Sequence, residues 1–290
     1  MSRIAIIGSG TVGQATGKGL AKSGHSIIFI DNDPEVLEQL RNNGYHAAYT
    51  NQLARIQYET SILCLPTPLQ SNMVDLSYYE QVLPYIGDTL SSCEAYHLVV
   101  IRSTIPPATT GRFIIPKLEL LSQRKAGRDF GVCMNPEFLR HASSDNDFLH
   151  PWSIVIGSLD QRSGDTLLEL YKHIIQKEQP HVVKTDLKTA ETIKYVQNLY
   201  NATKISFSNE IWSVCQKLHI DCDTVMEAVA QSAEGMWNSR YGIRGGYAYS
   251  GSCLVKDTIG FLSHAKQKLD VEMPLLEATI KVNNSLEKHT

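Results

Sequence analysis

The chain has 290 residues, of which 42% are hydrophobic and 20% are charged, and its formal net charge is -3 at pH 7. This length allows two ordinary domains with proper cores, and a charge without a basic excess argues against a nucleic-acid or anionic-membrane partner. The 6 cysteines are scattered without a Cys-x-x-Cys pair, which argues against a zinc site or a disulfide scaffold and indicates a reducing, cytoplasmic location.

A dinucleotide-binding fingerprint opens the chain. The opening run from Met1 to Gly8 predicts a buried strand that is far too short to span a membrane and stands where the charged and apolar regions of a signal peptide would be, so we expect a soluble, unexported protein. The run Gly-Ser-Gly-Thr-Val-Gly then starts at Gly8, which permits a tight turn; Gly10 lets the backbone approach a pyrophosphate, and Gly13 lets the next helix pack closely. The following strand ends at Asp31, where an acid binds the ribose 2′-hydroxyl and repels a 2′-phosphate. The fingerprint predicts NAD rather than NADP, against the alternative of glycines that serve only a turn.

Helices and strands continue to alternate as far as residue 185. Strands that are separated by helical segments predict a Rossmann-like, parallel, doubly wound sheet, so we expect an NAD-binding α/β domain over residues 1–185. The predicted helices cover 14–22, 34–42, 76–90, 114–123 and 164–175, and the predicted strands cover 26–30, 60–65, 97–101, 130–134 and 153–156.

The pattern changes to helices in the last third of the chain. Residues 187–218 contain no Gly or Pro and repeat apolar residues at helical spacing, which predicts one helix about 45 Å long. Lys194 and Asn198 lie four apart on it and share a face, although a solvated surface lysine is the simpler interpretation of Lys194. We expect a helical substrate and dimerisation domain over 186–290. Its further predicted helices cover 223–232, 257–269 and 274–287, with a glycine-rich loop over 242–251.

Cys253 indicates chemistry beyond a single hydride transfer. An aldehyde has no hydride ready to leave until a nucleophile adds to it, and a thiolate can add to give a thiohemiacetal, which loses a hydride to become a thioester. Lys256 lies three residues further on, and a nearby cation favours the reactive thiolate. The alternative is an inert buried thiol, which the residues around Cys253 alone leave open.

Together these runs resemble the UDP-glucose/GDP-mannose dehydrogenase family, whose members use NAD to oxidise a sugar C6 alcohol to a carboxylate in two hydride steps. The resemblance covers nearly the whole chain and implies an NAD-dependent enzyme of this kind that acts as a homodimer through the long helix. It rests on seven elements in order: the glycine fingerprint, Asp31, Leu65-Pro66-Thr67-Pro68, Ser103-Thr104-Ile105-Pro106, Asn135-Pro136-Glu137-Phe138-Leu139-Arg140, Lys194 with Asn198, and Gly251-Ser252-Cys253-Leu254-Val255-Lys256-Asp257.

The resemblance also implies roles for single residues. It places the nucleophile at Cys253 and a water-activating pair at Asp257 and Thr104. A lysine and an asparagine that stabilise negative charge on oxygen fall on Lys194 and Asn198, and a cation and an amide donor suit that task. The carboxylate that assists thioester hydrolysis falls on Glu137, the substrate contacts on Phe138, Leu139 and Tyr249, and the cofactor contacts on Gly8, Gly10, Thr11, Val12, Gly13, Asp31, Thr67 and Lys256.

Simpler roles stay open for three of these residues. Thr104 could cap a helix, Glu137 could pair with Arg140, and Asp257 could be an N-cap. No metal site is expected.

The chain also departs from the family pattern. Members usually continue into a second Rossmann-like domain that grips the nucleotide, whereas this chain ends at Thr290. Ser250 and Val255 replace a usual glycine and proline near the cysteine, His141 replaces an acid, and Val36 replaces a cofactor-side lysine or arginine. Since remote binding energy supports turnover, we expect a short relative that oxidises a primary alcohol on a smaller or carrier-bound substrate. A nucleotide sugar stays possible if a partner chain supplies the grip.

Two other functions remain as alternatives. A two-electron β-hydroxyacid dehydrogenase would use Lys194 and Asn198, leave Cys253 idle and release one NADH per substrate instead of two. A non-catalytic NAD-binding subunit would have no use for Cys253, Asp257 and Glu137. Either way, a long amphipathic helix has more apolar surface than one small helical domain covers, which predicts a homodimer.

Overall fold

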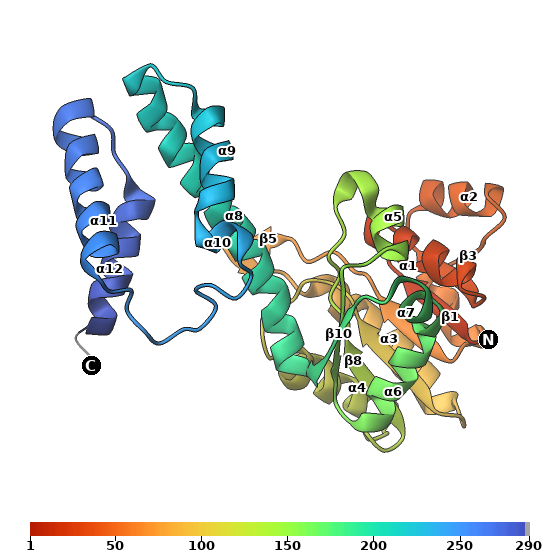
Figure 1. Cartoon of the computed structure of the whole chain (residues 1–290). Helices are drawn as coiled ribbons and strands as arrows, with labels where there is room; N and C mark the ends of the chain where they lie inside the picture. Colours follow the sequence, from red (N-terminus) through yellow and green to blue (C-terminus); the bar gives the residue numbers. More distant parts are fainter. Residues whose placement is uncertain (288–290) are drawn as a thin grey trace. The chain divides into compact units, whose positions relative to one another are not determined.

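The structure, a computed structural model, describes residues 1–287 (Figure 1). The chain forms two compact units, an N-terminal unit over Met1–Gln197 and a C-terminal unit over Asn198–Thr290. The division falls inside helix α8 (Leu187–Leu218), whose bounds are those predicted from the sequence. The predicted domain boundary lies where this helix begins.

The N-terminal unit is built on an eight-stranded sheet with the order β10-β9-β8-β7-β4-β1-β2-β3. Its strands are β1 (Arg3–Ile7), β2 (Ser26–Asp31), β3 (His46–Tyr49), β4 (Thr60–Leu63), β7 (His97–Ile101), β8 (Phe130–Met134), β9 (Ser153–Ser158) and β10 (His181–Asp186). The strands from β8 to β3 in this order pair in parallel, which confirms the predicted Rossmann-like fold. A small antiparallel hairpin, β5 (Leu69–Gln70) with β6 (Met73–Val74), forms a separate sheet.

One edge of the sheet corrects the prediction of a wholly parallel arrangement. β8 and β9 pair antiparallel, and β10 then pairs with β9 in parallel. Between β8 and β9 the chain forms only η3 (His141–Ser143) and α5 (Ser144–Leu149), and α5 packs on α1 (Thr11–Lys22). A parallel pair needs a crossover connection that carries the chain back to the opposite edge. Without one, β9 starts at the edge where β8 ends and runs the other way.

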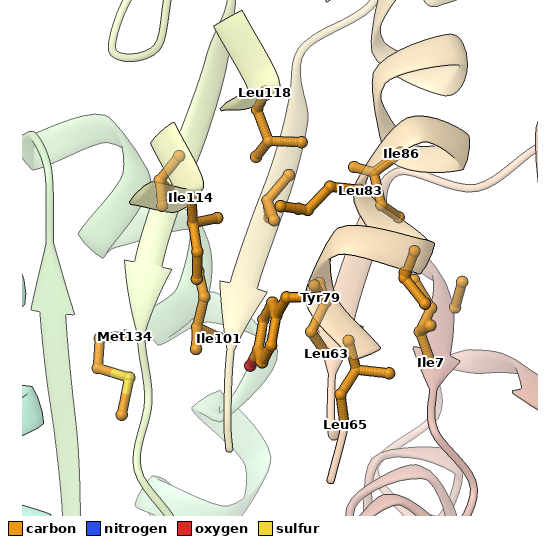
Figure 2. Close-up of a cluster of buried hydrophobic side chains, with 14 of the residues drawn as sticks. Ile7, Leu63, Leu65, Tyr79, Leu83, Ile86, Ile101, Ile114, Leu118 and Met134 are labelled. Carbon is orange, nitrogen blue, oxygen red and sulfur yellow. The ribbon is translucent and has the colours of Figure 1, made fainter. Parts of the chain in front are cut away.

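Each face of the sheet is covered by its own apolar cluster. In β1, Ala5 and Ile7 belong to one cluster, and Ile4 and Ile6 belong to the other, because successive side chains of a strand point to opposite faces. Figure 2 shows the first cluster, in which Tyr79 lies among the aliphatic side chains. The remaining helical elements of this unit are α2 (Pro34–Asn42), η1 (Thr50–Arg55), α3 (Ser77–Ser92), η2 (Thr110–Ile114), α4 (Ile115–Ser122), α6 (Gln161–Leu170) and α7 (Lys172–Glu178).

The C-terminal unit is helical, as predicted. After α8 it contains α9 (Cys222–Ser232), α10 (Glu234–Trp237), α11 (Ser252–His264), the π-helical turn η4 (Ala265–Leu269) and α12 (Pro274–Glu287). Its buried apolar cluster is small and consists of Val214, Ala265, Val271 and Met273. Of the helices in residues 1–287, none is both long enough and apolar enough to cross a membrane.

Candidate active site

The glycine-rich loop between β1 and α1 has the shape that the fingerprint predicts. Gly8 has a φ of +89°, and a Cβ built there would lie 2.5 Å from the carbonyl oxygen of Cys64. A Cβ on Gly13 would lie 2.0 Å from the carbonyl oxygen of Gly8, so neither position accepts a larger residue. A Cβ on Gly10, in contrast, would meet no described atom within 4 Å. The backbone at Gly10 is therefore open to the close approach of a ligand.

Asp31 lies at the end of β2 and is tied to this loop. Its Oδ2 accepts a hydrogen bond from the backbone N–H of Ser9 at 2.6 Å. Its Oδ1 accepts from the backbone N–H groups of Asn32 and Asp33, at 2.8 and 3.1 Å. No side chain within residues 1–287 caps the N-terminus of α1 after Gly10, and free N–H groups at a helix N-terminus attract phosphates. The loop, the helix end and the carboxylate thus present the groups that a dinucleotide requires.

The loops after β4 and β7 are joined to each other. Thr67 Oγ1 donates a hydrogen bond to the carbonyl oxygen of Thr104 at 2.8 Å. Ser103 Oγ donates to the carbonyl oxygen of Leu65 at 2.7 Å. Thr104 lies several residues before the next helical element, which starts at Thr110, so it is not a helix cap.

Lys194, which is buried, and Glu137, which is partly buried, form an ion pair. Lys194 Nζ lies 2.9 Å from Glu137 Oε1, and Lys194 is only 6% exposed, so it is not the solvated lysine of the simpler interpretation. Glu137 Oε2 accepts a hydrogen bond from the backbone N–H of Leu139 at 2.6 Å. Lys194 Nζ also lies 5.7 Å from the centre of the Phe138 ring. Arg140 pairs with Asp147 at 2.7 Å and leaves Glu137 to Lys194.

Arg102 supports the Glu137 loop, a role that sequence reasoning missed. It is 4% exposed, and its guanidinium donates to Thr16 Oγ1 at 2.8 Å and to Asn135 Oδ1 at 2.6 Å. Tyr171 donates its hydroxyl to the same Asn135 oxygen at 2.6 Å, and the guanidinium lies over the Phe148 ring. Asn135 begins the loop that carries Glu137, so this network fixes where the loop starts. The only signal in the sequence is a charged residue directly after an apolar strand.

Cys253 lies in the first turn of α11 and is exposed. The helix begins at Ser252, earlier than predicted, so Asp257 is inside it and is not an N-cap. Cys253 and Asp257 are four residues apart and therefore share a face of α11. Lys256 Nζ lies 3.0 Å from Asp257 Oδ1, and both of these side chains are exposed.

Three other thiols of the chain are poorly suited to act as nucleophiles. Burial raises the pKa of Cys64 to about 12, and it raises the pKa of Cys133 as well. Burial and the nearby Cys215 thiol raise the pKa of Cys222. Since the thiolate is the nucleophile, these three thiols are poor candidates for a nucleophile.

Asn283 holds the loop that precedes Cys253, and it too was missed. This residue of α12 is 4% exposed. Its side-chain oxygen accepts from the backbone N–H of Tyr249 at 2.6 Å, and its nitrogen donates to the Tyr249 carbonyl oxygen at 3.2 Å. The amide thus pairs with Tyr249 as a neighbouring strand would. Its partner is 34 positions away, so sequence spacing carried no sign of the contact.

A groove of about 600 Å³ lies within the C-terminal unit. Its walls are mainly apolar, and they include Phe207 of α8, Phe261 of α11 and Leu276 of α12. Asp257, Lys204 and Glu210 also line it. Over residues 1–287, His, Cys, Asp and Glu side chains form no cluster of three or more that could hold a metal ion.

The predicted site residues therefore form two groups, one in each unit. The N-terminal unit joins Lys194 to Glu137 and Thr67 to Thr104. The C-terminal unit holds Asn198, Tyr249, Cys253, Lys256 and Asp257.

Models of one protein family match most of the chain. The NAD binding domain of the UDP-glucose/GDP-mannose dehydrogenase family matches residues 46–175, and the central domain of that family matches residues 188–285. A TrkA-N domain model matches residues 4–55.

Curated relatives and solved structures agree with this match. GDP-mannose 6-dehydrogenase of Pseudomonas savastanoi pv. phaseolicola is 36% identical over 98% of this chain and 68% of its own length. UDP-glucose 6-dehydrogenase AglM of Haloferax volcanii is 32% identical over 97% of this chain and 69% of its own length. A ternary complex of GDP-mannose dehydrogenase from Pseudomonas aeruginosa superposes with a TM-score of 0.91 at 33% identity, over 99% of this chain and 69% of that one. A UDP-glucose dehydrogenase from Pyrobaculum islandicum superposes with a TM-score of 0.73 at 28% identity, over 98% of this chain and 68% of that one.

Proposed function

Because the chain belongs to the UDP-glucose/GDP-mannose dehydrogenase family, we propose that it oxidises the C6 alcohol of a nucleotide sugar to a carboxylate in two hydride steps. It is an NAD-dependent oxidoreductase that acts on CH–OH groups. The observation that carries the proposal is the exposed thiol of Cys253 in the first turn of α11, with Asp257 one turn later. A nucleophile is needed only when the aldehyde is oxidised further.

The N-terminal unit fits NAD. The open backbone at Gly10 and the uncapped start of α1 suit a pyrophosphate, and the carboxylate of Asp31 suits a ribose hydroxyl. Thr11 and Val12 begin α1, so their backbone lies at this helix N-terminus. When bound, NAD accepts the hydride that leaves the substrate carbon. Thr67 and Lys256 are further cofactor contacts in this proposal.

The side chains divide the proton and charge transfers between them. Asp257 and Thr104, through a water molecule, take the proton of the alcohol as its first hydride leaves. The Cys253 thiolate then adds to the aldehyde carbon, and Lys194 and Asn198 stabilise the negative charge that develops on its oxygen. Loss of a second hydride from this thiohemiacetal leaves a thioester on Cys253.

Hydrolysis completes the cycle. Water adds to the thioester carbon with the help of Glu137, the carbon–sulfur bond breaks, and the carboxylate leaves Cys253 as a free thiolate. The buried contact of Glu137 with Lys194 keeps the carboxylate in place. Phe138, Leu139 and Tyr249 are the substrate contacts of the proposal.

The relatives favour a nucleotide sugar over the smaller or carrier-bound substrate expected from the sequence. The Pseudomonas savastanoi relative is named for GDP-mannose, and the Haloferax volcanii relative is named for UDP-glucose. The first is the more similar of the two, so GDP-mannose is the first substrate to test.

The test counts NADH released per substrate consumed. Purified protein is mixed with NAD and either GDP-mannose, UDP-glucose, a simple primary alcohol or a hydroxyacyl thioester, and the product mass is measured. Two NADH and a uronate from a nucleotide sugar support the proposal. One NADH and a product that stops at the carbonyl would instead support the two-electron dehydrogenase, and turnover of only the other substrates would reject the nucleotide sugar.

A Cys253→Ser variant separates the two hydride steps. It should stop at the aldehyde level or accumulate a covalent intermediate, while unimpaired acid formation would rule out the thiol mechanism. Cys93→Ser, which alters a partly buried thiol outside the site, is the matched control and should leave acid formation unchanged.

The protein also acts as a homodimer in this proposal. Helix α8 exposes the large apolar side chains of Leu199, Ile205 and Trp212. Exposed apolar side chains that are grouped on one helix are typical of a surface that another protein covers. A second copy is the partner that the family resemblance implies. Light scattering at micromolar concentration gives the mass, and a monodisperse monomer would refute the dimer.

A further inference from the structure

Glu191 is a buried carboxylate to which none of the proposed catalytic steps assigns a role. It lies near the start of α8, is 1% exposed, and has no Lys, Arg or His partner within 4 Å among residues 1–287. Burying a carboxylate without compensation is costly, so its hydrogen bonds must offset the loss of hydration. The partners of these hydrogen bonds indicate which segment the Glu191 carboxylate holds.

Both carboxylate oxygens of Glu191 bind the segment that follows Thr104. Oε2 accepts from the backbone N–H of Ala108 at 2.5 Å, and Oε1 accepts from the backbone N–H of Thr110 at 2.7 Å. Hydrogen bonds to an ionised carboxylate are shorter and stronger than neutral ones. Ala108 has a φ of +73° and lies in a turn directly before η2, and backbone N–H groups of a turn of this kind can converge on one anionic group. The segment is thus folded around the carboxylate.

The same turn of α8 is fixed on its other sides. Ala190 packs against β9 so closely that a Cβ on Gly157 would lie 2.5 Å from the Ala190 side chain. Lys194, one turn after Glu191, holds Glu137. The start of α8 therefore touches the loop of Glu137 with one side chain and the loop of Thr104 with another.

We propose that Glu191 is a positioning residue, whose carboxylate holds the Thr104–Thr110 segment at a fixed place beside the Lys194–Glu137 pair. This inference rests on the proposed function for its catalytic consequence, and the Thr67 bond to the Thr104 carbonyl oxygen supplies the second anchor of the segment. Without Glu191, the N–H groups of Ala108 and Thr110 lose their acceptor and the segment loosens.

Two variants of the full-length protein test the proposal. Glu191→Gln keeps the volume but sets an amide N–H against one of the two backbone N–H groups, and Glu191→Ala empties the space. Glu119→Gln is the matched control, because Glu119 lies in α4 and also accepts a backbone N–H, that of Ala126 at 3.1 Å, away from the Thr104 segment. Circular dichroism checks that each variant is folded.

The first readout is amide hydrogen exchange in a peptide that covers residues 104–114. We expect at least about tenfold faster exchange at Ala108 and Thr110 in both Glu191 variants, because the amides lose their acceptors, and no change in Glu119→Gln. Unchanged exchange in the Glu191 variants overturns the proposal. This measurement needs no substrate, so it decides the structural claim even if the protein oxidises no nucleotide sugar and the proposed function fails.

The second readout is the steady-state kinetics on the substrate that the wild-type protein oxidises. Misplacing a reacting group by about 1 Å can cost about 100-fold, so kcat should fall by about that factor while the KM for NAD changes little. Adding formate to Glu191→Ala should restore at least part of the kcat and slow the exchange again, because formate supplies a carboxylate of the right size. Faster exchange with an unchanged kcat overturns the positioning role. The role is also overturned if formate restores neither the lost kcat nor the slow exchange in Glu191→Ala.

Discussion

The two units of this chain bury their surfaces to very different degrees. The N-terminal unit encloses a cluster of fully buried apolar side chains on each face of its sheet. Over residues 198–287, the apolar cluster of the C-terminal unit has four buried members, although several large apolar side chains of α8 and α11 are exposed. The N-terminal unit therefore has the larger apolar core, and the C-terminal unit has the larger exposed apolar surface for its size, which the proposed dimer would cover.

The proposed site residues follow the same division. Lys194 and Glu137 belong to the N-terminal unit and are buried against each other. Cys253 and Asp257 belong to the C-terminal unit and are exposed. Substitutions in the first pair should therefore affect stability and activity together, and substitutions in the second should affect activity alone.

Removing Lys194 from its ion pair with Glu137 should give the largest difference in stability between the two groups of site residues. Lys194→Ala leaves Glu137, whose side chain is 14% exposed, without its cation, and breaking a largely buried ion pair in this way costs about 3 kcal/mol. Cys253→Ser alters an exposed side chain and should change the free energy of unfolding by less than about 0.5 kcal/mol. Urea denaturation measures both. Equal losses of unfolding free energy in the two variants would contradict the assignment of Lys194 to a buried part of the site and of Cys253 to an exposed part.

A charge on the exposed face of α8 tests whether the C-terminal unit is covered by a second copy. Ile205 is 63% exposed, and Ile205→Asp places a carboxylate where the proposed interface is apolar. We expect dimer dissociation to become about 1000-fold easier, or about 4 kcal/mol, because the charge must be desolvated on association. Sedimentation equilibrium gives the dissociation constant. Ile205→Leu keeps an apolar side chain and should leave the dimer intact; an unaffected dimer in Ile205→Asp would place the interface elsewhere.

Sequence patterns predicted the long elements of both units because their signals are repeated. Helix α8 has the predicted bounds, since the apolar spacing continues over its whole length without Gly or Pro. The edge strands β3 and β10 were missed because most of their side chains are exposed or only partly buried, which leaves little apolar alternation to read. The antiparallel entry of β9 depends on a connection that stays at one edge of the sheet, which no local pattern encodes.

Motifs indicated the candidate catalytic residues but not the residues that support them. Glu191 binds Ala108 across 83 positions, and Arg102 binds Asn135 across 33. Backbone N–H groups are present at every residue except proline, so the sequence does not show which of them a buried acid will bind. Lys194 was recognised from its place in a motif, whereas its buried ion pair with Glu137 became visible only in the structure.

A buried histidine should make the N-terminal core sensitive to acid. Burial lowers the pKa of His97 from 6.5 to about 4, and Ser61 Oγ lies 2.8 Å from its Nε2 atom. The unfolded chain therefore binds a proton that the folded protein excludes. The free energy of unfolding falls as the pH drops from about 6.5 to about 4, by about 3 kcal/mol, and does not depend on this group above that window.

Urea denaturation as a function of pH measures the His97 effect. His97→Gln should flatten most of the decrease, with a smaller slope left by His25, whose pKa burial also lowers. The exposed His46 is the matched control, and His46→Gln should keep the wild-type profile. If the free energy of unfolding of His97→Gln falls with pH as much as that of the wild-type protein, other groups cause the acid sensitivity.

The smallest expected effect concerns the backbone that Glu191 holds. Ala108 adopts a φ of +73°, which costs an L-residue with a Cβ about 1 to 2 kcal/mol and costs glycine nothing. Ala108→Gly should stabilise the N-terminal unit, but only by about 0.5 to 1 kcal/mol, because glycine also gives the unfolded chain more freedom. Ala190→Gly, in the regular helix α8, makes the same chemical change and should destabilise the protein by about 1 kcal/mol or more. Opposite signs in thermal unfolding would show that the turn around Glu191 is conformationally demanding, and a loss of stability in both variants would contradict it.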